Sequence, residues 1–298
     1  MDIKKSFKSN GHLEAISSFI IWGLVPIYWH YLHAIPAALN TSLRIMVTAI
    51  TINILFWNRK LFKDLPKIFK EKKLFFTLML TSLLITSNWY VFLVSFQKGM
   101  VWQASLGYFL SPLCNVLLAI IFLKEKLSTP LKLATLFILI AISNMVWHLG
   151  SLPWISLYLC LSFSFYALIK KGVKLSAQSG LNLEVLLILP FAIWGIFVDG
   201  GLNSYQLSTF EWEIMALSGL VTLVPLILYN SGAQKIPFGH LAIYQYIAPS
   251  LQFFVAVIIF KEHLDPFHYQ SFFLIWCGLM VFTWERIMTI KRKKGIIT

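Results

Sequence analysis

Charged residues are scarce in this sequence of 298 residues: Asp, Glu, Lys and Arg together make up 12%, whereas 58% of the residues are hydrophobic. A soluble domain usually carries about 25% charged residues. Uncharged apolar stretches of about 20 residues recur along nearly the whole chain, and each is long enough to cross a hydrocarbon layer of ~30 Å. A soluble fold could not cover this much apolar surface, so we expect an integral membrane protein.

Acidic residues are especially few, with 12 Asp and Glu against 25 Lys and Arg. Every aspartate lies outside the apolar stretches, which argues against an intramembrane aspartyl protease with two buried carboxylates. The sequence contains no HExxH, GxSxG or P-loop motif, so we expect no enzyme activity and no cofactor. The basic residues lie between the apolar stretches and not on one face beside aromatic residues, which argues against nucleic-acid binding.

Cysteine is also rare. Cys114, Cys160 and Cys277 each lie inside an apolar stretch, without CxxC spacing and without a nearby His. This pattern does not suggest a metal site, and we expect all three to be small packing residues. The first apolar stretch follows a basic, polar segment and continues past Pro26 without a small-residue cleavage site, which indicates an uncleaved first helix.

The apolar stretches predict an all-α membrane protein with ten transmembrane helices. Helices are expected because lipid cannot satisfy backbone N–H and C=O groups, and the stretches are too long for strands of a barrel. The predicted spans are 12–32, 37–57, 74–97, 102–123, 130–147, 153–170, 180–198, 212–234, 239–260 and 267–287.

The basic residues predict the orientation of these spans. If the N-terminus is cytoplasmic, Lys98 and Lys261 lie outside and Arg44 lies within a span, which leaves 22 of the 25 Lys and Arg on the cytoplasmic side. Cytoplasmic loops of membrane proteins carry such an excess of Lys and Arg. We therefore expect a multi-pass protein of a bacterial inner membrane with both termini in the cytoplasm.

An internal repeat is visible when the sequence is shifted by 137 positions. The shift superimposes Gln97-Lys98 on Gln234-Lys235, Pro112 on Pro249, Ala119 on Ala256, Lys124-Glu125 on Lys261-Glu262, Leu127 on Leu264, and Trp147 on Trp284. We expect the two Lys-Glu pairs to cap helices. The repeat predicts two homologous five-helix halves, 12–148 and 153–288, which are inverted because five is odd. Inverted halves are common in secondary transporters, although a duplication that only enlarged the bundle is an alternative.

Two ionisable residues lie inside the predicted spans and need a partner or a wet cavity. Arg44 follows Pro36 by eight residues, which places it about 12 Å from the outer face, and Glu184 lies about 8 Å from the inner face. A functional interpretation makes Arg44 an anion-binding group and Glu184 a proton or cation site. The alternative is a structural ion pair between them or a side chain that extends to the interface.

Six polar or amphipathic residues lie within the spans and are candidates for contact with a solute. An amide in hydrocarbon needs a neighbouring helix or a cavity, whereas a Tyr or Trp in a span often only packs. These candidates are Asn88, Trp89, Tyr108, Tyr166, Gln245 and Tyr246. The matched residues Pro112 and Pro249 interrupt the fourth and ninth spans, which we expect to line a cavity, unless the kinks serve packing alone.

A family resemblance is carried by FIIWGLVPIYW (19–29), NWYVFLVSFQKG (88–99), SLGYFLSPLCNVLLAIIFLKEKL (105–127), SFSFYALIKK (162–171), GLNLEVLLILP (180–190), LSGLVTLVPL (217–226) and YQYIAPSLQFF (244–254). In order and spacing these stretches resemble the RarD group of the EamA-like drug/metabolite transporters. The resemblance implies two inverted five-helix halves around a central cavity. It also implies that Arg44, Glu184 and the six residues above occupy motif positions of the group.

The sequence departs from the group at three positions. The second helix of the group usually carries a Glu and a His before the Arg, where this sequence has Leu39 and Leu43. A proton-coupling scheme based on that Glu therefore does not apply. The Asn that precedes the proline of the fourth helix is Ser111 here, so the solute can differ from that of better-known relatives.

These features predict a secondary transporter that moves a small solute across the bilayer by alternating access, without ATP hydrolysis. The sequence does not distinguish between a metabolite, an amino-acid-like compound and a drug as the solute. For the assembly we consider a homodimer. An alternative function is a membrane-embedded sensor or assembly partner without transport, although the longest polar loop, 58–73, is short for an output domain. A channel is disfavoured because no ring of like charges is visible.

Overall fold

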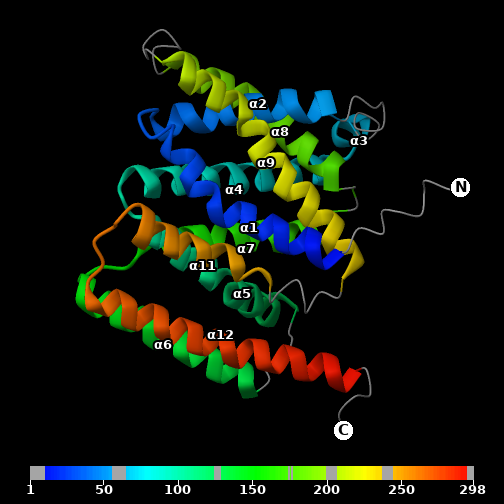
Figure 1. The fold of residues 1–298 in the computed structure, drawn as a ribbon. Coiled ribbons are helices and arrows are strands. Elements are labelled where there is room, and N and C mark those ends of the chain that lie inside the picture. Colours follow the sequence, from blue (N-terminus) through cyan, green and yellow to red (C-terminus); the bar gives the residue numbers. More distant parts are fainter. Residues whose placement is uncertain are drawn as a thin grey trace, which may run out of the picture.

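The computed structural model describes residues 11–55, 65–123, 129–173, 175, 177–198, 207–236 and 244–293. Within these ranges the regular secondary structure is entirely helical. Figure 1 shows long helices that lie side by side and cross at moderate angles, with short connections at their ends. This arrangement confirms the expected all-α membrane fold.

Ten of these helices occupy the ten predicted spans. They are α1 (Gly11–His30), α2 (Ala37–Leu55), α4 (Lys72–Gln97), α5 (Val101–Leu123), α6 (Thr129–Leu149), α7 (Trp154–Lys171), α8 (Ala177–Val198), α9 (Thr209–Lys235), α11 (Ile247–Phe254) and α12 (Pro266–Lys293). A π-helical turn, Val255–Ile259, continues α11. The helix α12 extends beyond its predicted end, and a short helix, α3 (Leu65–Lys70), occupies part of the segment that we expected to be a loop. The predicted start of the ninth span, at 239, lies outside the described residues.

Local sequence signals define several helix ends. The hydroxyl of Ser208 accepts a hydrogen bond from the backbone N–H of Glu211, whose carboxylate accepts one from the backbone N–H of Ser208, and this capping box begins α9. Gly99 and Gly150, with φ of 61° and 65°, follow α4 and α6. A left-handed backbone conformation favours glycine at such helix ends.

One of the predicted capping residues acts between the two halves. The carboxylate of Glu262 accepts hydrogen bonds of 2.8 and 3.0 Å from the backbone N–H groups of Val101 and Trp102, the first two residues of α5. Free N–H groups at a helix start attract a carboxylate. The capping role expected for Glu262 is confirmed, whereas Lys124 and Glu125 lie outside the described residues.

The helices pair mainly across the two halves of the chain. The helix α1 packs against α9 and α11, and α7 packs against α4 and α5. Further pairs join α2 to α8 and α9, α4 to α8, α5 to α11, and α6 to α12. In Figure 1, α6 and α12 lie together along one edge of the bundle, and α1, α7, α5 and α11 lie nearer its middle.

Small residues allow some of these helices to approach closely. A Cβ atom on Gly107 of α5 would lie 2.7 Å from the backbone carbonyl oxygen of Ser156 in α7, and a Cβ atom on Gly232 of α9 would lie 2.8 Å from the backbone nitrogen of Ala15 in α1. Close helix contacts in membranes commonly depend on such residues. Glycine therefore fixes the α5–α7 and α1–α9 distances.

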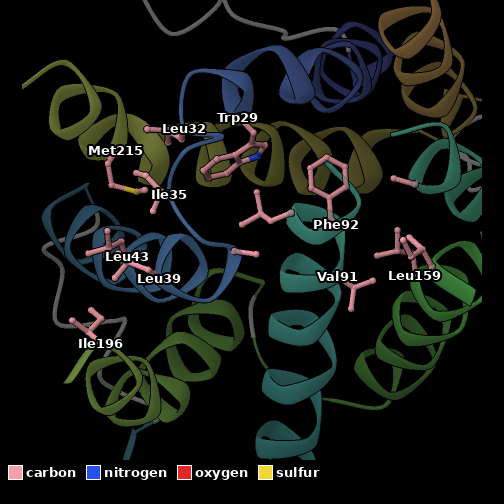
Figure 2. Packing of buried hydrophobic residues seen from close by; sticks show 14 residues of the cluster. Trp29, Leu32, Ile35, Leu39, Leu43, Val91, Phe92, Leu159, Ile196 and Met215 are labelled. Atoms are coloured by element: carbon pink, nitrogen blue, oxygen red, sulfur yellow. The ribbon is translucent and has the colours of Figure 1, made fainter. Parts of the chain in front are cut away.

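A large apolar cluster fills the interior between seven helices. Its members come from α1 and the turn that follows, α2, α4, α5, α7, α8 and α9, and Figure 2 shows them, among them Trp29, Leu39, Leu43, Phe92 and Leu159. Leu39 and Leu43 are 2% and 4% exposed. These two of the three departures described above therefore contribute to apolar packing.

The outer surface of the bundle suits lipid. By length and hydropathy alone, five helical segments within the described residues are able to cross a membrane, namely Ala37–Leu55, Lys72–Gln97, Lys132–Leu149, Ser179–Phe197 and Thr209–Tyr229. Large apolar side chains are exposed along the helices, including Trp147 at 84% and Phe197 at 73%. Exposed apolar area of this extent fits a hydrocarbon environment.

The cysteines correct one expectation. Cys114 of α5 and Cys160 of α7 form a disulfide, so these two are not simply packing residues, and Cys277 of α12 is free. Their separation of 46 residues gave no spacing signal in the sequence. The bond adds a covalent connection to the close contact between α5 and α7.

Candidate functional site

Arg44 is the central residue of a buried polar cluster. Its side chain is 8% exposed, and its Nε–H donates a hydrogen bond of 3.0 Å to the hydroxyl of Thr222 in α9. Thr222 is itself buried, at 2% exposed. The cluster therefore joins α2 of the first half to α9 of the second.

Two indole rings lie next to this guanidinium group. The Cζ atom of Arg44 lies 4.3 Å from the ring centroid of Trp89 in α4 and 5.0 Å from that of Trp29 in α1. Aromatic faces at this distance attract a cation. No described carboxylate forms a salt bridge with Arg44.

Glu184 of α8 forms a second buried cluster, with partners from α4 and α7. Its side chain is 1% exposed. Its carboxylate lies 2.9 Å from the Nζ of Lys170 in α7, and it accepts hydrogen bonds of 2.6 Å from Thr81 in α4 and 3.2 Å from Tyr166 in α7. The charge of Glu184 is thus compensated by Lys170 and hydrogen-bonded at both oxygens.

The alternative of a structural ion pair between Arg44 and Glu184 is therefore wrong. The cationic partner of Glu184 is Lys170, which the sequence analysis had assigned only to membrane orientation. The reason is geometric: Lys170 lies in the last turn of α7, one turn after Tyr166, and a lysine side chain is long enough to reach inward from a helix end. The two charged clusters are separate.

Asn88 joins three helices. Its Nδ2 donates hydrogen bonds to the carbonyl oxygen of Leu159 at 3.0 Å and to the hydroxyl of Ser162 at 2.9 Å, both in α7. Its Oδ1 accepts one of 3.3 Å from Tyr108 in α5. The expectation that this amide faces neighbouring helices is confirmed, and its position next to Trp89 in α4 connects it to the Arg44 cluster.

Of the remaining predicted residues, one lies in the Glu184 cluster and the others lie on or next to α5 and α11. Tyr166 belongs to the Glu184 cluster. Gln245 and Tyr246 are half-buried just before α11, and Tyr246 packs against an apolar cluster to which α5, α6, α7, α11 and α12 contribute. Pro112 and Pro249 lie in α5 and α11, which contact each other, and the carbonyl oxygen of Pro249 accepts a hydrogen bond of 2.8 Å from Ser105.

Four residues of the two clusters escaped the sequence analysis. Trp29 resembled one of many interfacial tryptophans, and Lys170 one of many cytoplasmic lysines. Thr81 and Thr222 are hydroxyl residues of a kind that usually bonds within its own helix. Their roles depend on which helices are neighbours, and the sequence alone does not supply this.

Comparisons with known proteins identify the class to which this architecture belongs. The model of the EamA-like transporter family matches residues 9–147. A solved crystal structure superimposes on 94% of this chain and 99% of its own with a TM-score of 0.60, and its sequence identity of 15% shows the fold alone. The chain belongs to the EamA-like transporter family, and it is a multi-pass membrane transporter.

Relatives with sequence identity over nearly the whole chain narrow this assignment. An uncharacterized transporter of Pseudomonas aeruginosa is 36% identical over 95% of this chain and 96% of its own length. RarD of Salmonella typhimurium is 31% identical over 98% and 100%, and RarD of Escherichia coli is 30% identical over 98% and 99%. Within its family the chain belongs to the RarD group.

Proposed function

We propose that this protein is a secondary transporter that carries a small solute by alternating access of two inverted five-helix halves, 12–148 and 153–288. The observation that supports this most is the Arg44 cluster, because a buried and unpaired cation is joined to side chains from both halves. Ionisable groups inside a membrane commonly mark the path of a substrate. The Glu184 cluster also joins both halves, through Thr81.

The helix pairs support an exchange between equivalent halves. If α1, α2, α4, α5 and α6 correspond in order to α7, α8, α9, α11 and α12, the α1–α9 pair corresponds to α7–α4, and α1–α11 to α7–α5. The α2–α9 pair corresponds to α8–α4, whereas α2–α8, α5–α11 and α6–α12 correspond to themselves. Two halves with matched contacts can exchange conformations and expose one site to either side.

The candidate site residues take distinct roles in this proposal. Arg44 binds the solute, Trp89 and Tyr108 form part of the wall, and Asn88 positions Tyr108. Glu184 and Tyr166 form a second polar region, and Gln245, Tyr246, Pro112 and Pro249 belong to the facing helices α5 and α11 or their ends.

At one end of the bundle, polar contacts join the two halves. The Nζ of Lys235 in α9 donates to both carboxylate oxygens of Glu14 in α1, at 2.7 and 2.9 Å. Nearby, His12 of α1 forms a hydrogen bond of 2.9 Å with Tyr244, just before α11. The basic residues of the loops support a cytoplasmic location for this end, and in this proposal opening toward the cytoplasm breaks these contacts.

Flux is the direct test of transport. Metabolites exported or retained by cells with and without the protein would be compared, and the solutes that differ would be measured for uptake into proteoliposomes. We expect saturable flux that requires the protein and no nucleotide. A solute that binds without any flux, in either vesicle orientation, would instead support the sensor alternative.

A further inference from the structure

We infer that the solute is a monovalent carboxylate, bound at Arg44 as its only charged group, and not a zwitterionic amino acid. The inference rests on the proposed function and narrows its solute class. It depends on the balance of charge and of hydrogen-bond donors in the two buried clusters.

The first step concerns the unused donors of Arg44. A guanidinium group carries five N–H donors and no acceptor, and a carboxylate can accept two of them in parallel. Only the Nε–H is bonded, to Thr222, since no other described residue accepts a hydrogen bond from this side chain. The two Nη groups are therefore available to a carboxylate.

The second step concerns polar atoms around Arg44 that lack a partner. Thr48 is one turn after Arg44 on α2, Ser218 is one turn before Thr222 on α9, and these two helices pack together. Both hydroxyls are completely buried without a hydrogen-bond partner, as is the Nε1–H of Trp29. All three groups can donate to an anion.

Other hydroxyls of α2 do have partners within the helix. Thr41 and Thr51 of α2 each donate to the carbonyl oxygen four residues earlier, at 2.7 Å. Thr48 lies between them on the same helix and makes no such bond. Because a buried polar group without a partner is unfavourable, orphan donors beside an unpaired cation indicate a site for an anion.

The third step excludes a partner for an ammonium group. Glu184 is the buried carboxylate in the described spans that could attract a second, positive charge on a solute, and Lys170 already compensates it. Glu14 is paired with Lys235, and Glu262 caps α5. Asn40, one turn before Arg44, offers an unpartnered amide oxygen, which can accept from a hydroxyl or amide but carries no charge.

These observations favour a net charge of minus one on the solute. A carboxylate at Arg44 neutralises the cluster, whereas the ammonium group of an amino acid would stay buried without a charged partner, which is strongly unfavourable in low dielectric. The apolar cluster and the two indole rings next to the guanidinium suit an apolar or aromatic body.

A matched set of three probes tests the inference on the purified full chain in nanodiscs. The probes 3-phenylpropionate, L-phenylalanine and 2-phenylethylamine share a phenyl ring and differ in whether they carry a carboxylate, both charges, or an ammonium group. Binding would be measured from the shift in the thermal unfolding midpoint with probe concentration. We expect saturable binding of 3-phenylpropionate and at least about tenfold weaker binding of the other two, because an unpaired charge or a lost charged hydrogen bond costs about that much.

Variants locate the binding site. Arg44→Lys keeps the charge but loses the paired donors, so we expect binding of 3-phenylpropionate to weaken about tenfold, and Arg44→Gln should abolish it. Lys98→Gln removes one positive charge on an exposed turn and should leave binding unchanged. Equal or tighter binding of L-phenylalanine, no saturable binding of 3-phenylpropionate, or unchanged binding by a folded Arg44→Gln protein would each overturn the inference.

The inference and the proposed function fail in different ways. Flux of a zwitterionic or cationic solute through Arg44 would overturn the inference and leave the transport proposal intact. Arg44-dependent binding of 3-phenylpropionate in a protein that supports no flux of any solute would overturn the transport proposal and leave the inference about the bound carboxylate intact.

Discussion

At the scale of single residues, the described part of the chain contains two kinds of buried charge: Glu184 has a charged partner, and Arg44 has none. Arg44 is surrounded by rings and hydroxyls, and Glu184 has a cation and two hydroxyl donors. An intramembrane arginine without a carboxylate is unfavourable unless it faces a ligand or water. The unpaired charge is therefore the one to which we assign a function in the proposal, whereas the paired charge has structural partners.

The Lys170–Glu184 pair leads to a prediction about stability. Lys170→Met would leave the carboxylate of Glu184 buried without its cation, and we expect the free energy of unfolding to fall by about 1–3 kcal/mol, since Lys170 itself is partly exposed. The double variant Lys170→Met/Glu184→Gln should recover most of the loss because the buried carboxylate that lost its cation is also removed. The thermal unfolding midpoint in detergent would be measured, with Lys98→Met as the control, and a double variant no more stable than the single one would contradict the pairing.

The sequence predicts where the buried polar residues lie in the membrane, but it does not predict their partners. The depth of Arg44 and Glu184, and the need of Asn88 for partners, follow from residue type and span position, so these residues could be identified from the sequence. Their partners could not, because Thr222 lies 178 residues from Arg44 and Thr81 lies 103 from Glu184. Hydropathy places residues along a helix but does not state which helices are neighbours.

At the scale of elements, hydropathy located the spans because lipid requires long, continuous helices. It did not locate α3, the π-helical turn at Val255–Ile259, or the disulfide between α5 and α7. The helix α3 lies in a polar segment, and the π-helical turn leaves the apolar pattern unchanged. The disulfide depends on the approach of two helices that are distant in the sequence.

The close contact between α5 and α7 leads to a prediction about stability. Gly107→Ala would place a methyl group 2.7 Å from the carbonyl oxygen of Ser156, so we expect destabilisation by about 1–3 kcal/mol from the forced separation of the helices. Gly172→Ala is the matched control, since the nearest atom would be 3.5 Å away, and its effect should stay within about 0.5 kcal/mol. Equal unfolding midpoints for the two variants would argue against close packing at Gly107.

At the scale of the whole molecule, the distribution of Lys and Arg predicts the topology. Reporter fusions after Gly99, Gly150 and Gly201 should report the periplasmic side, and fusions after Lys67, Lys174 and Lys294 the cytoplasm, because basic loops stay inside. A cytoplasmic signal after Gly201 would contradict both the ten-span topology and the inverted halves. Dual reporters with opposite compartment requirements would control for expression.

The contacts at the end that we expect to face the cytoplasm provide the last prediction. Because Lys235 and Glu14 join α9 to α1, removal of one charge in Glu14→Gln should favour the state that is open toward the cytoplasm. A single reporter cysteine at Tyr108, in a chain with Cys277→Ser that retains the Cys114–Cys160 disulfide, would be labelled by a membrane-impermeant thiol reagent applied to each side separately.

We expect Glu14→Gln to increase labelling of this cysteine from the cytoplasmic side and to reduce it from the opposite side, since alternating access couples the two. Charge exchange in Glu14→Lys/Lys235→Glu should restore the original labelling, because an ion pair of either polarity connects the same two helices. Lys98→Gln, at the opposite end, serves as the charge control. Labelling that rises on both sides together would indicate general loosening of the bundle, and no labelling from either side in any variant would place the solute path away from Tyr108.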